Sequence, residues 1–160
     1  MKYIAILSVL VLILTLVGVG YMYMTANIFV DAVGVVATEA TNQLPLFEEL
    51  QNQLRLGAVI GTPYIASQEL PGAENYQFLT YTVRLQNNCS VSADMVELQV
   101  TPMAGDVLQI GSFTDVKLPA GQSVDVNVTI LTDRSMHHIR EVTITYYIWG
   151  VPFTMKTTIK

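Results

Sequence analysis

The sequence is poor in cysteine and in basic residues, and both shortages exclude whole classes of function. Cys89 is the only cysteine among 160 residues, so neither an intrachain disulfide nor a thiolate metal cluster can form. Lys and Arg together number 8 against 13 Asp and Glu, which gives a net charge of -5. A nucleic-acid surface needs clustered basic residues. We therefore expect no nucleic acid among the partners of this chain.

The sequence also lacks the common catalytic motifs. It contains no Gly-rich phosphate loop and no evident Ser/His/Asp arrangement. Its two histidines, His137 and His138, are adjacent. Side chains of neighbours on an extended chain point to opposite faces, so this pair cannot easily share one metal ion. We predict a solvated loop, no cofactor and no enzymatic activity, and the alternative that this pair supports is a metal-binding accessory subunit of a membrane enzyme complex.

One long hydrophobic run is present near the N-terminus. It begins at Tyr3 and ends at Tyr23, and it contains no charged residue. About 20 apolar residues span the hydrocarbon core of a bilayer as a helix. A cleaved signal peptide has a shorter apolar core and a small-x-small cleavage site, which Met24-Thr25-Ala26 matches poorly. We predict that residues 1–27 form an uncleaved transmembrane anchor in contact with the lipid bilayer.

Basic residues beside the anchor predict its orientation. Lys2 and the free amine precede the run, and no Lys or Arg follows it until Arg55. Basic flanks stay in the cytoplasm, so we expect a cytoplasmic N-terminus and an extracytoplasmic remainder. Small residues let membrane helices approach closely. At 100° per residue one arc of the helix carries four of them, a predicted helix-contact face for a homo-oligomer: Ala5, Ser8, Thr15 and Gly18.

Residues 28–55 carry a helical pattern. Apolar residues recur at gaps of three and four through residues 33–54, which is typical of an amphipathic helix. Pro45 interrupts this stripe and suits the first turn of a new helix. We predict a membrane-proximal linker of two short helices with a break near residues 42–45. The alternative is a first β-strand over residues 28–36, which are rich in Val and Ile.

From residue 56 onward the pattern changes to a period of two, which is typical of strands with one apolar face. Alternation is clear in five segments, namely residues 79–86, 96–101, 124–130, 142–148 and 153–160. Two weaker segments cover residues 58–67 and 107–116. Turn signals rich in Gly, Pro and Asn separate the segments. We predict a mainly β chain whose residues 56–160 form a seven-stranded antiparallel immunoglobulin-like β-sandwich.

Three of these segments carry a family resemblance. They read YTVRLQNN over residues 81–88, VELQV over residues 96–100 and LPAGQSVDVNV over residues 118–128. The pattern resembles membrane-anchored sandwich modules, both the type-two late-embryogenesis-abundant (water-stress) domains and bacterial adhesion-related sandwich domains. The resemblance implies a non-catalytic module and assigns no functional residue.

Large aromatic residues gather at the last predicted hairpin. Alternation places Tyr146 on one face with Ile144 and Ile148, and it places Tyr147 and Trp149 on the other. If the first face is core, the second carries two exposed aromatics, and exposed aromatics often mark partner surfaces. The alternative is that the linker helices cover Tyr147 and Trp149.

Two further features concern Cys89 and two asparagines. Cys89 is either a buried small residue or a free thiol for intermolecular pairing. Asn88-Cys-Ser90 and Asn127-Val-Thr129 match the N-glycosylation pattern, which matters only in an organism that glycosylates exported chains.

These observations favour a non-catalytic function. We expect a single-pass structural or accessory subunit of a membrane or cell-envelope assembly, whose partners are other membrane or envelope proteins. The alternative is a pilin-like surface filament subunit, because a long N-terminal apolar helix precedes a β domain.

Overall fold

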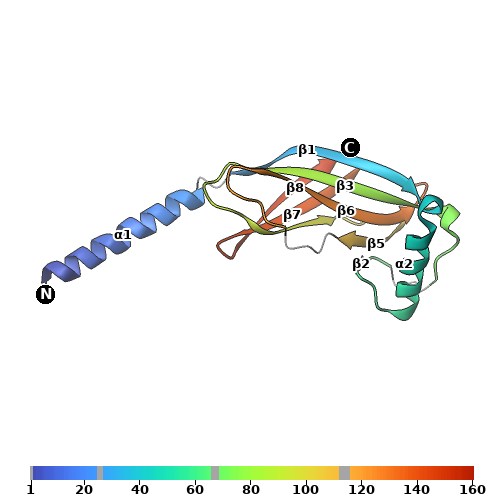
Figure 1. The fold of residues 1–160 in the computed structure, drawn as a ribbon, viewed down its shortest axis with the longest axis horizontal. Helices are drawn as coiled ribbons and strands as arrows, with labels where there is room; N and C mark the ends of the chain where they lie inside the picture. Colours follow the sequence, from blue (N-terminus) through green and yellow to red (C-terminus); the bar gives the residue numbers. More distant parts are fainter. Residues whose placement is uncertain (1, 25–26, 66–68, 112–115) are drawn as a thin grey trace.

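The computed structural model describes residues 2–24, 27–65, 69–111 and 116–160. Helix α1 comes first, short helices and two strands follow, and the second half of the chain contains only strands among its described elements (Figure 1). The elements in chain order are α1 (Lys2–Met24), β1 (Ile28–Glu39), η1 (Ala40–Gln43), α2 (Leu44–Leu56), β2 (Thr62–Pro63), η2 (Ala73–Asn75), β3 (Tyr76–Asn87), β4 (Asp94–Val100), β5 (Asp106–Gly111), β6 (Ser123–Asp133), β7 (Arg140–Ile148) and β8 (Val151–Ile159).

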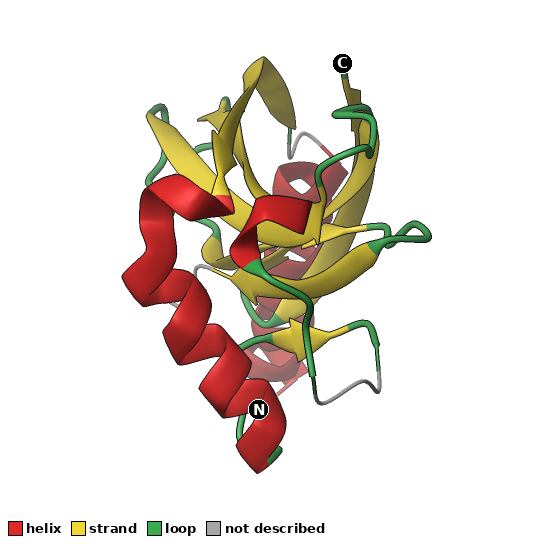
Figure 2. Cartoon of the chain, turned by 90° about the vertical axis from the view of Figure 1, so that its right-hand side faces the viewer, coloured by secondary structure: helices red, strands yellow, loops and turns green. Residues whose placement is uncertain are grey.

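The strands form two antiparallel sheets that share one core. The larger sheet has the order β1-β3-β6-β5-β2 and the smaller sheet has the order β4-β7-β8. Buried apolar side chains from both sheets make a single cluster, with Tyr81 and Val126 from one sheet and Leu98 and Ile144 from the other. Figure 2 shows the strand layers from the end opposite α1. The prediction of a mainly β, antiparallel, sandwich-like domain is therefore confirmed.

The number of strands differs from the seven predicted. The described residues contain eight strands, five in one sheet and three in the other. Within the described part of the weak segment at residues 58–67, the strand is β2, which pairs Thr62 and Pro63 with β5. Proline donates no hydrogen bond to a sheet, so this edge strand ends at once. The additional strand is β1, which precedes the region where the sandwich was expected to begin.

The prediction of a helix over the first part of residues 28–55 is wrong. Those residues form β1, which pairs along β3 from Ile28↔Asn87 to Glu39↔Gln77. The alternative of a first strand is the one confirmed. Two features hide this strand in the sequence: a register shift between Val30 and Ala32 breaks the period of two, and most of its side chains are exposed because it is the edge strand.

The second predicted helix is present as α2, but it lies far from the anchor. Its apolar stripe buries Phe47, Leu50 and Leu54 against the end of the larger sheet. Pro45 stands in its first turn, and Gly57 ends it with a left-handed φ of 67°. In Figure 1 α1 and α2 lie at opposite ends of the sheets, so α2 is no membrane-proximal linker. We call the end beside α1 the anchor end and the end beside α2 the distal end.

Candidate functional site

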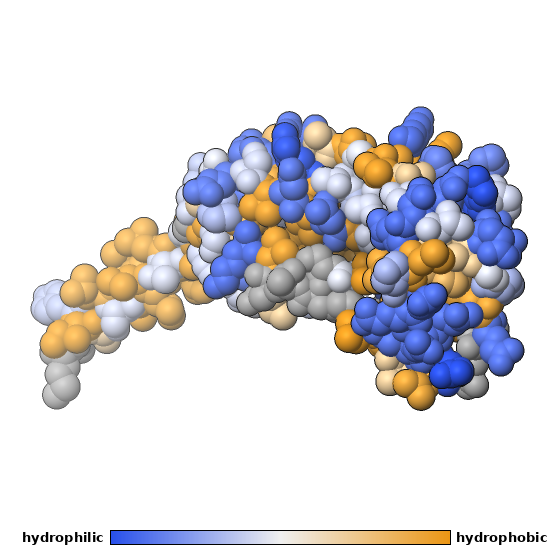
Figure 3. All heavy atoms as spheres, turned by 45° about the vertical axis from the view of Figure 1, so that its right-hand side comes forward, coloured by the Kyte–Doolittle hydropathy of each residue, from blue (hydrophilic) through white to orange (hydrophobic). Residues whose placement is uncertain are grey.

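The part of helix α1 whose side chains are described is not buried by the rest of the chain. Its stretch Tyr3–Tyr21 is apolar and long enough to cross a membrane, and none of it is buried. Figure 3 shows hydrophobic residues over the visible side of this helix, whereas the domain surface mixes both kinds. A helix that is apolar all round suits a lipid environment better than water.

The predicted helix-contact face of α1 is open. Ser8 donates a hydrogen bond to the carbonyl of Ala5 at 2.9 Å, and Thr15 donates one to the carbonyl of Val11 at 2.9 Å. Both hydroxyls are therefore satisfied within the helix. A Cβ placed on Gly18 would meet no described atom within 4 Å. The face is free for a second helix, and association through it stays a prediction.

The anchor end of the domain is joined closely to α1. Helix α1 ends at Met24 and β1 begins at Ile28, so only residues 25–27 lie between them. The backbone of Asn27 already bonds to the β3–β4 loop: its carbonyl accepts the N–H of Asn88 at 3.0 Å, and its N–H donates to the sulfur of Cys89 at 3.0 Å. The domain therefore begins at Asn27, three positions after the last residue of α1.

The β7–β8 turn stands at the same anchor end (Figure 1). Tyr146 is buried and stacks on Phe153 with ring centroids 5.5 Å apart. Trp149 is 55% exposed, as alternation along β7 predicts. Because α2 lies at the distal end, it does not cover Trp149, and the alternative that linker helices shield this aromatic is wrong. Tyr147 is only partly exposed, so Trp149 is the more prominent of the two.

Trp149 and Met95 share an unusual backbone. They are the two residues other than glycine with a positive φ in the described part of the chain, at 51° for Trp149 and 52° for Met95. Left-handed backbone is unfavourable for bulky side chains. Met95 is 58% exposed, and the pairing Asp94↔Tyr147 places it on the strand beside the turn. No residue pattern around Met95 or Trp149 predicts a left-handed backbone.

Four exposed apolar residues thus collect at the anchor end. They come from the first residues of β1, the start of β4 and the β7–β8 turn. We call them the anchor-end patch: Phe29, Met95, Trp149 and Val151.

Cys89 and Asn87 stabilise the β3–β4 loop beside this patch. Of the two alternatives for Cys89, the structure shows a buried residue. The amide of Asn87 donates to the carbonyls of Val91 and Leu118, and its oxygen accepts the N–H of Cys89 at 2.8 Å. The predicted Asn87-Asn88 turn is therefore held by a fully bonded side chain, and the thiol is sequestered within it.

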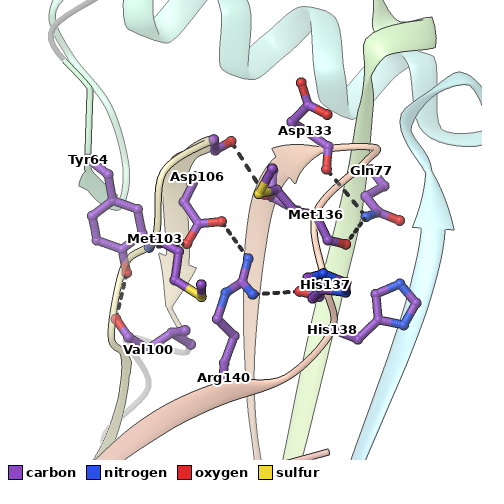
Figure 4. Close-up of polar contacts among 12 residues, drawn as sticks. Tyr64, Gln77, Val100, Met103, Asp106, Asp133, Met136, His137, His138 and Arg140 are labelled. Atoms are coloured by element: carbon purple, nitrogen blue, oxygen red, sulfur yellow. Dashed lines mark hydrogen bonds and ion pairs between the residues drawn. The ribbon is translucent and has the colours of Figure 1, made fainter.

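The distal end contains a buried ion pair that the sequence analysis missed. Arg140 at the start of β7 donates to Asp106 of β5 at 3.0 Å, and both side chains are fully buried. Arg140 also donates to the carbonyls of His137 and Ile139, and Asp106 accepts the N–H of Met103 at 2.7 Å (Figure 4). Since β5 and β7 belong to different sheets, this pair links the sheets.

Three neighbouring side chains extend this polar link. Gln109 of β5 bonds the backbone of Leu98 and Val100 in β4, and Tyr64 donates to Gln109 at 2.8 Å. Tyr81 donates to the carbonyl of His138 at 2.9 Å. Burial raises the pKa of both tyrosines to about 12, so both stay neutral donors. We call the whole set the polar seam: Tyr64, Tyr81, Asp106, Gln109 and Arg140.

The two histidines serve the seam through their backbone. Both side chains are exposed, whereas their carbonyls accept from Arg140 and Tyr81. Across the described residues no group of three or more His, Cys, Asp or Glu could hold a metal ion. Arg140 has the same strand parity as Val142 and Ile144, and this is the signal that could have revealed it as a core residue.

The chemistry of the polar seam is structural. Its charged atoms are closed off from solvent, and nearly all of them have partners. A buried pair with satisfied hydrogen bonds fixes the way two elements pack. The anchor-end patch, in contrast, is apolar, strained and open, and it is the better candidate for contact with another body.

Comparison with known proteins supplies no assignment. No protein-family model matches the chain, and no curated protein matches it. The crystal structure of a FixG-related protein from Vibrio parahaemolyticus is similar over 81% of this chain and 95% of that one, with 12% identity and a TM-score of 0.35. A likeness at this level supports no inference about fold or function.

Proposed function

We propose that this chain is a single-pass, membrane-anchored, non-catalytic subunit of a membrane or cell-envelope assembly, with an extracytoplasmic β domain. The observation that carries the proposal is the unburied apolar helix α1, joined by residues 25–27 to a domain that buries a core of its own. An apolar helix that finds no cover within its own chain needs lipid or another protein around it.

The domain supplies reasons to regard the protein as non-catalytic. Its buried charged pair is closed, and the other described ion pairs lie on the surface. A catalytic site instead places titratable groups with shifted pKa values in an accessible pocket. We also propose that the sandwich belongs to the immunoglobulin-like class, since β3 and β4 follow one another in sequence but lie in different sheets.

The orientation can be tested by proteolysis of intact cells or spheroplasts. Lys2 precedes α1 and basic flanks stay inside, so protease added outside should remove the domain and leave the anchor in the membrane. Lysed cells provide the control for protease access. Complete protection in intact cells, with cleavage after lysis, would place the domain in the cytoplasm and contradict the proposal.

The filament alternative can be separated by the mass of the mature chain. A processed N-terminus favours a pilin-like subunit, and an intact one favours the anchor. The helical stripe of residues 33–54 could lengthen the helix of such a filament subunit, but its first part lies in β1 and is not continuous with α1.

A homo-oligomer through α1 can be tested in mild detergent. Replacing Ser8 and Gly18 together with Leu should reduce association of the full chain, because the backbones could no longer approach closely. Replacing Leu7 and Val17 with Ile is a matched control on the same helix. Unchanged association would show that α1 only tethers the domain.

A further inference from the structure

The anchor-end patch has a defined position relative to the end of α1. The segment from Met24 to Ile28 spans at most about 14 Å when fully extended. Phe29 follows Ile28 directly, and the β7–β8 turn lies at the same end of the sheets. If α1 crosses a bilayer, as in the proposed function on which this inference rests, the patch lies beside that bilayer.

The chemistry of the patch matches the membrane–water interface. Tryptophan is enriched at this boundary, where its apolar ring and polar N–H are both accommodated. Trp149 is 55% exposed, and Phe29, Met95 and Val151 are further exposed apolar residues at the same end of the domain. Exposure of these apolar side chains to water is unfavourable, whereas their burial in the interface of a bilayer is favourable.

The backbone supports the same conclusion. The two positive-φ residues other than glycine in the described chain both present a large apolar side chain to the outside at this end. A type I′ turn at residues 149–150 would be satisfied by Asn-Gly, the usual choice for two positive φ values. Strain at an exposed apolar residue points to a contact outside the chain, because strain that persists without internal benefit often has a functional reason.

The charges near the patch indicate whether its contact with a bilayer needs anionic lipid. Among the described residues near the patch, Lys117 pairs with Asp94 at 3.9 Å and Arg84 pairs with Asp125 at 2.7 Å. Asp31 stands exposed on β1 nearby. Docking on anionic lipid needs a cluster of basic residues, and this surface is neutral to acidic. The contact is therefore apolar and does not depend on anionic headgroups.

We propose that the anchor-end patch seats on the bilayer that holds α1, with Trp149 at the level of the lipid headgroups. The domain then has two attachments to one membrane, α1 and the β7–β8 turn. These two attachments hold it on the membrane surface in one orientation.

Trp149 is the only tryptophan in the chain, so its own fluorescence tests the proposal. The full-length protein is placed in phosphatidylcholine vesicles that carry bromine either near the headgroups or deep in the acyl chains. We expect blue-shifted emission, strong quenching by the shallow bromines, weaker quenching by the deep ones and poor quenching by aqueous acrylamide. Adding phosphatidylglycerol should change none of these values, and a requirement for anionic lipid would contradict an apolar contact.

A matched control moves the fluorophore to the distal end. Ile139 is 53% exposed and immediately precedes β7, at the end opposite the turn. In the double variant Trp149→Phe, Ile139→Trp, we expect emission typical of water, full quenching by acrylamide and no quenching by bromolipid. The two proteins then differ only in which end carries the indole.

The outcomes separate this inference from the proposed function. If alkaline carbonate extracts the protein from the vesicles, α1 is no anchor and the proposed function fails. If the protein stays inserted while acrylamide quenches Trp149 and bromolipid does not, the patch faces water and only the present inference is overturned. If Trp149 is shielded from both quenchers, a protein covers the patch, and loss of shielding on dilution with lipid would identify a second copy.

Discussion

The two ends of the β domain differ in how they cover the apolar core between the sheets. Each end must close a pair of sheets whose core is apolar. At the distal end α2 covers the core edge, and Arg140 and Asp106 turn inward to bind each other and the loop carbonyls. At the anchor end no described helix covers the edge, and Met95 and Trp149 turn outward in left-handed backbone. An end closed by internal bonds is a structural cap, and an end left apolar indicates an external contact.

The largest expected effect on stability comes from removing the buried ion pair at the distal end. Arg140→Met leaves the carboxylate of Asp106 buried without its charged partner, which should reduce the free energy of unfolding by about 3–5 kcal/mol. Urea unfolding of the full chain in detergent micelles, followed by circular dichroism, measures the loss. The double variant Arg140→Met, Asp106→Leu removes both charges and should recover most of it. An equal loss in the double variant would show that packing, not charge, closes this end.

The second effect depends on pH and concerns Tyr81. Its pKa is raised from 10.0 to about 12 by burial, and by Asp106 against the opposing effect of Arg140. A raised pKa means that the folded state keeps the proton longer than the unfolded chain, so this stabilisation is complete below pH 10 and is lost as the pH rises to about 12. The free energy of unfolding should therefore fall less between pH 8 and pH 11 in Tyr81→Phe than in the parent protein. An unchanged pH slope would contradict this role of the seam.

The third effect sharpens the contrast at the anchor end. Trp149→Asn should increase the free energy of unfolding by about 1 kcal/mol in detergent, because Asn tolerates the left-handed backbone and suits the turn before Gly150. Trp149→Phe keeps a bulky side chain in the same backbone and should leave stability nearly unchanged. Destabilisation by Asn would mean that the indole packs on its own domain. Gain of stability would show that the native residue serves another purpose.

The smallest effect concerns an exposed ion pair between the two ends. A hydrogen bond and the charge of Arg84 lower the pKa of Asp125. A lowered pKa gives stabilisation that is present above pH 3.8 and is lost as the pH falls through the lowered value. Arg84→Met should therefore flatten the acid side of the stability profile slightly, and less so at high salt. An effect as large as that of Arg140→Met would contradict the difference between buried and exposed pairs.

The sequence predicts those elements whose pattern is local. The alternation in β3, β4, β6, β7 and β8 was readable because each strand has one buried face and one wet face. The sequence predicts a helix in place of strand β1, because the bulge and the edge position of β1 break that alternation. The apolar run of α1 needed only its length and composition.

The parts of the site that depend on distant partners could not be predicted in this way. Asp106 and Arg140 lie 34 positions apart, and only the packing of two sheets brings them together. The exposure of Trp149 followed from alternation, but its strained backbone did not, since Trp before Gly is not a usual turn sequence. The likeness to water-stress and adhesion-related modules stays a prediction.

The position of β1 also determines how the domain carries mechanical load. If α1 is a membrane anchor, a pull transmitted through it enters the domain at Ile28, the first residue of β1. Because β1 lies antiparallel to β3 over its whole length, the pull runs along the strands and loads their hydrogen bonds together, in shear. A domain attached through a hairpin end would instead open one bond at a time. Connection through β1 therefore spreads a load that runs along the strands over many hydrogen bonds at once.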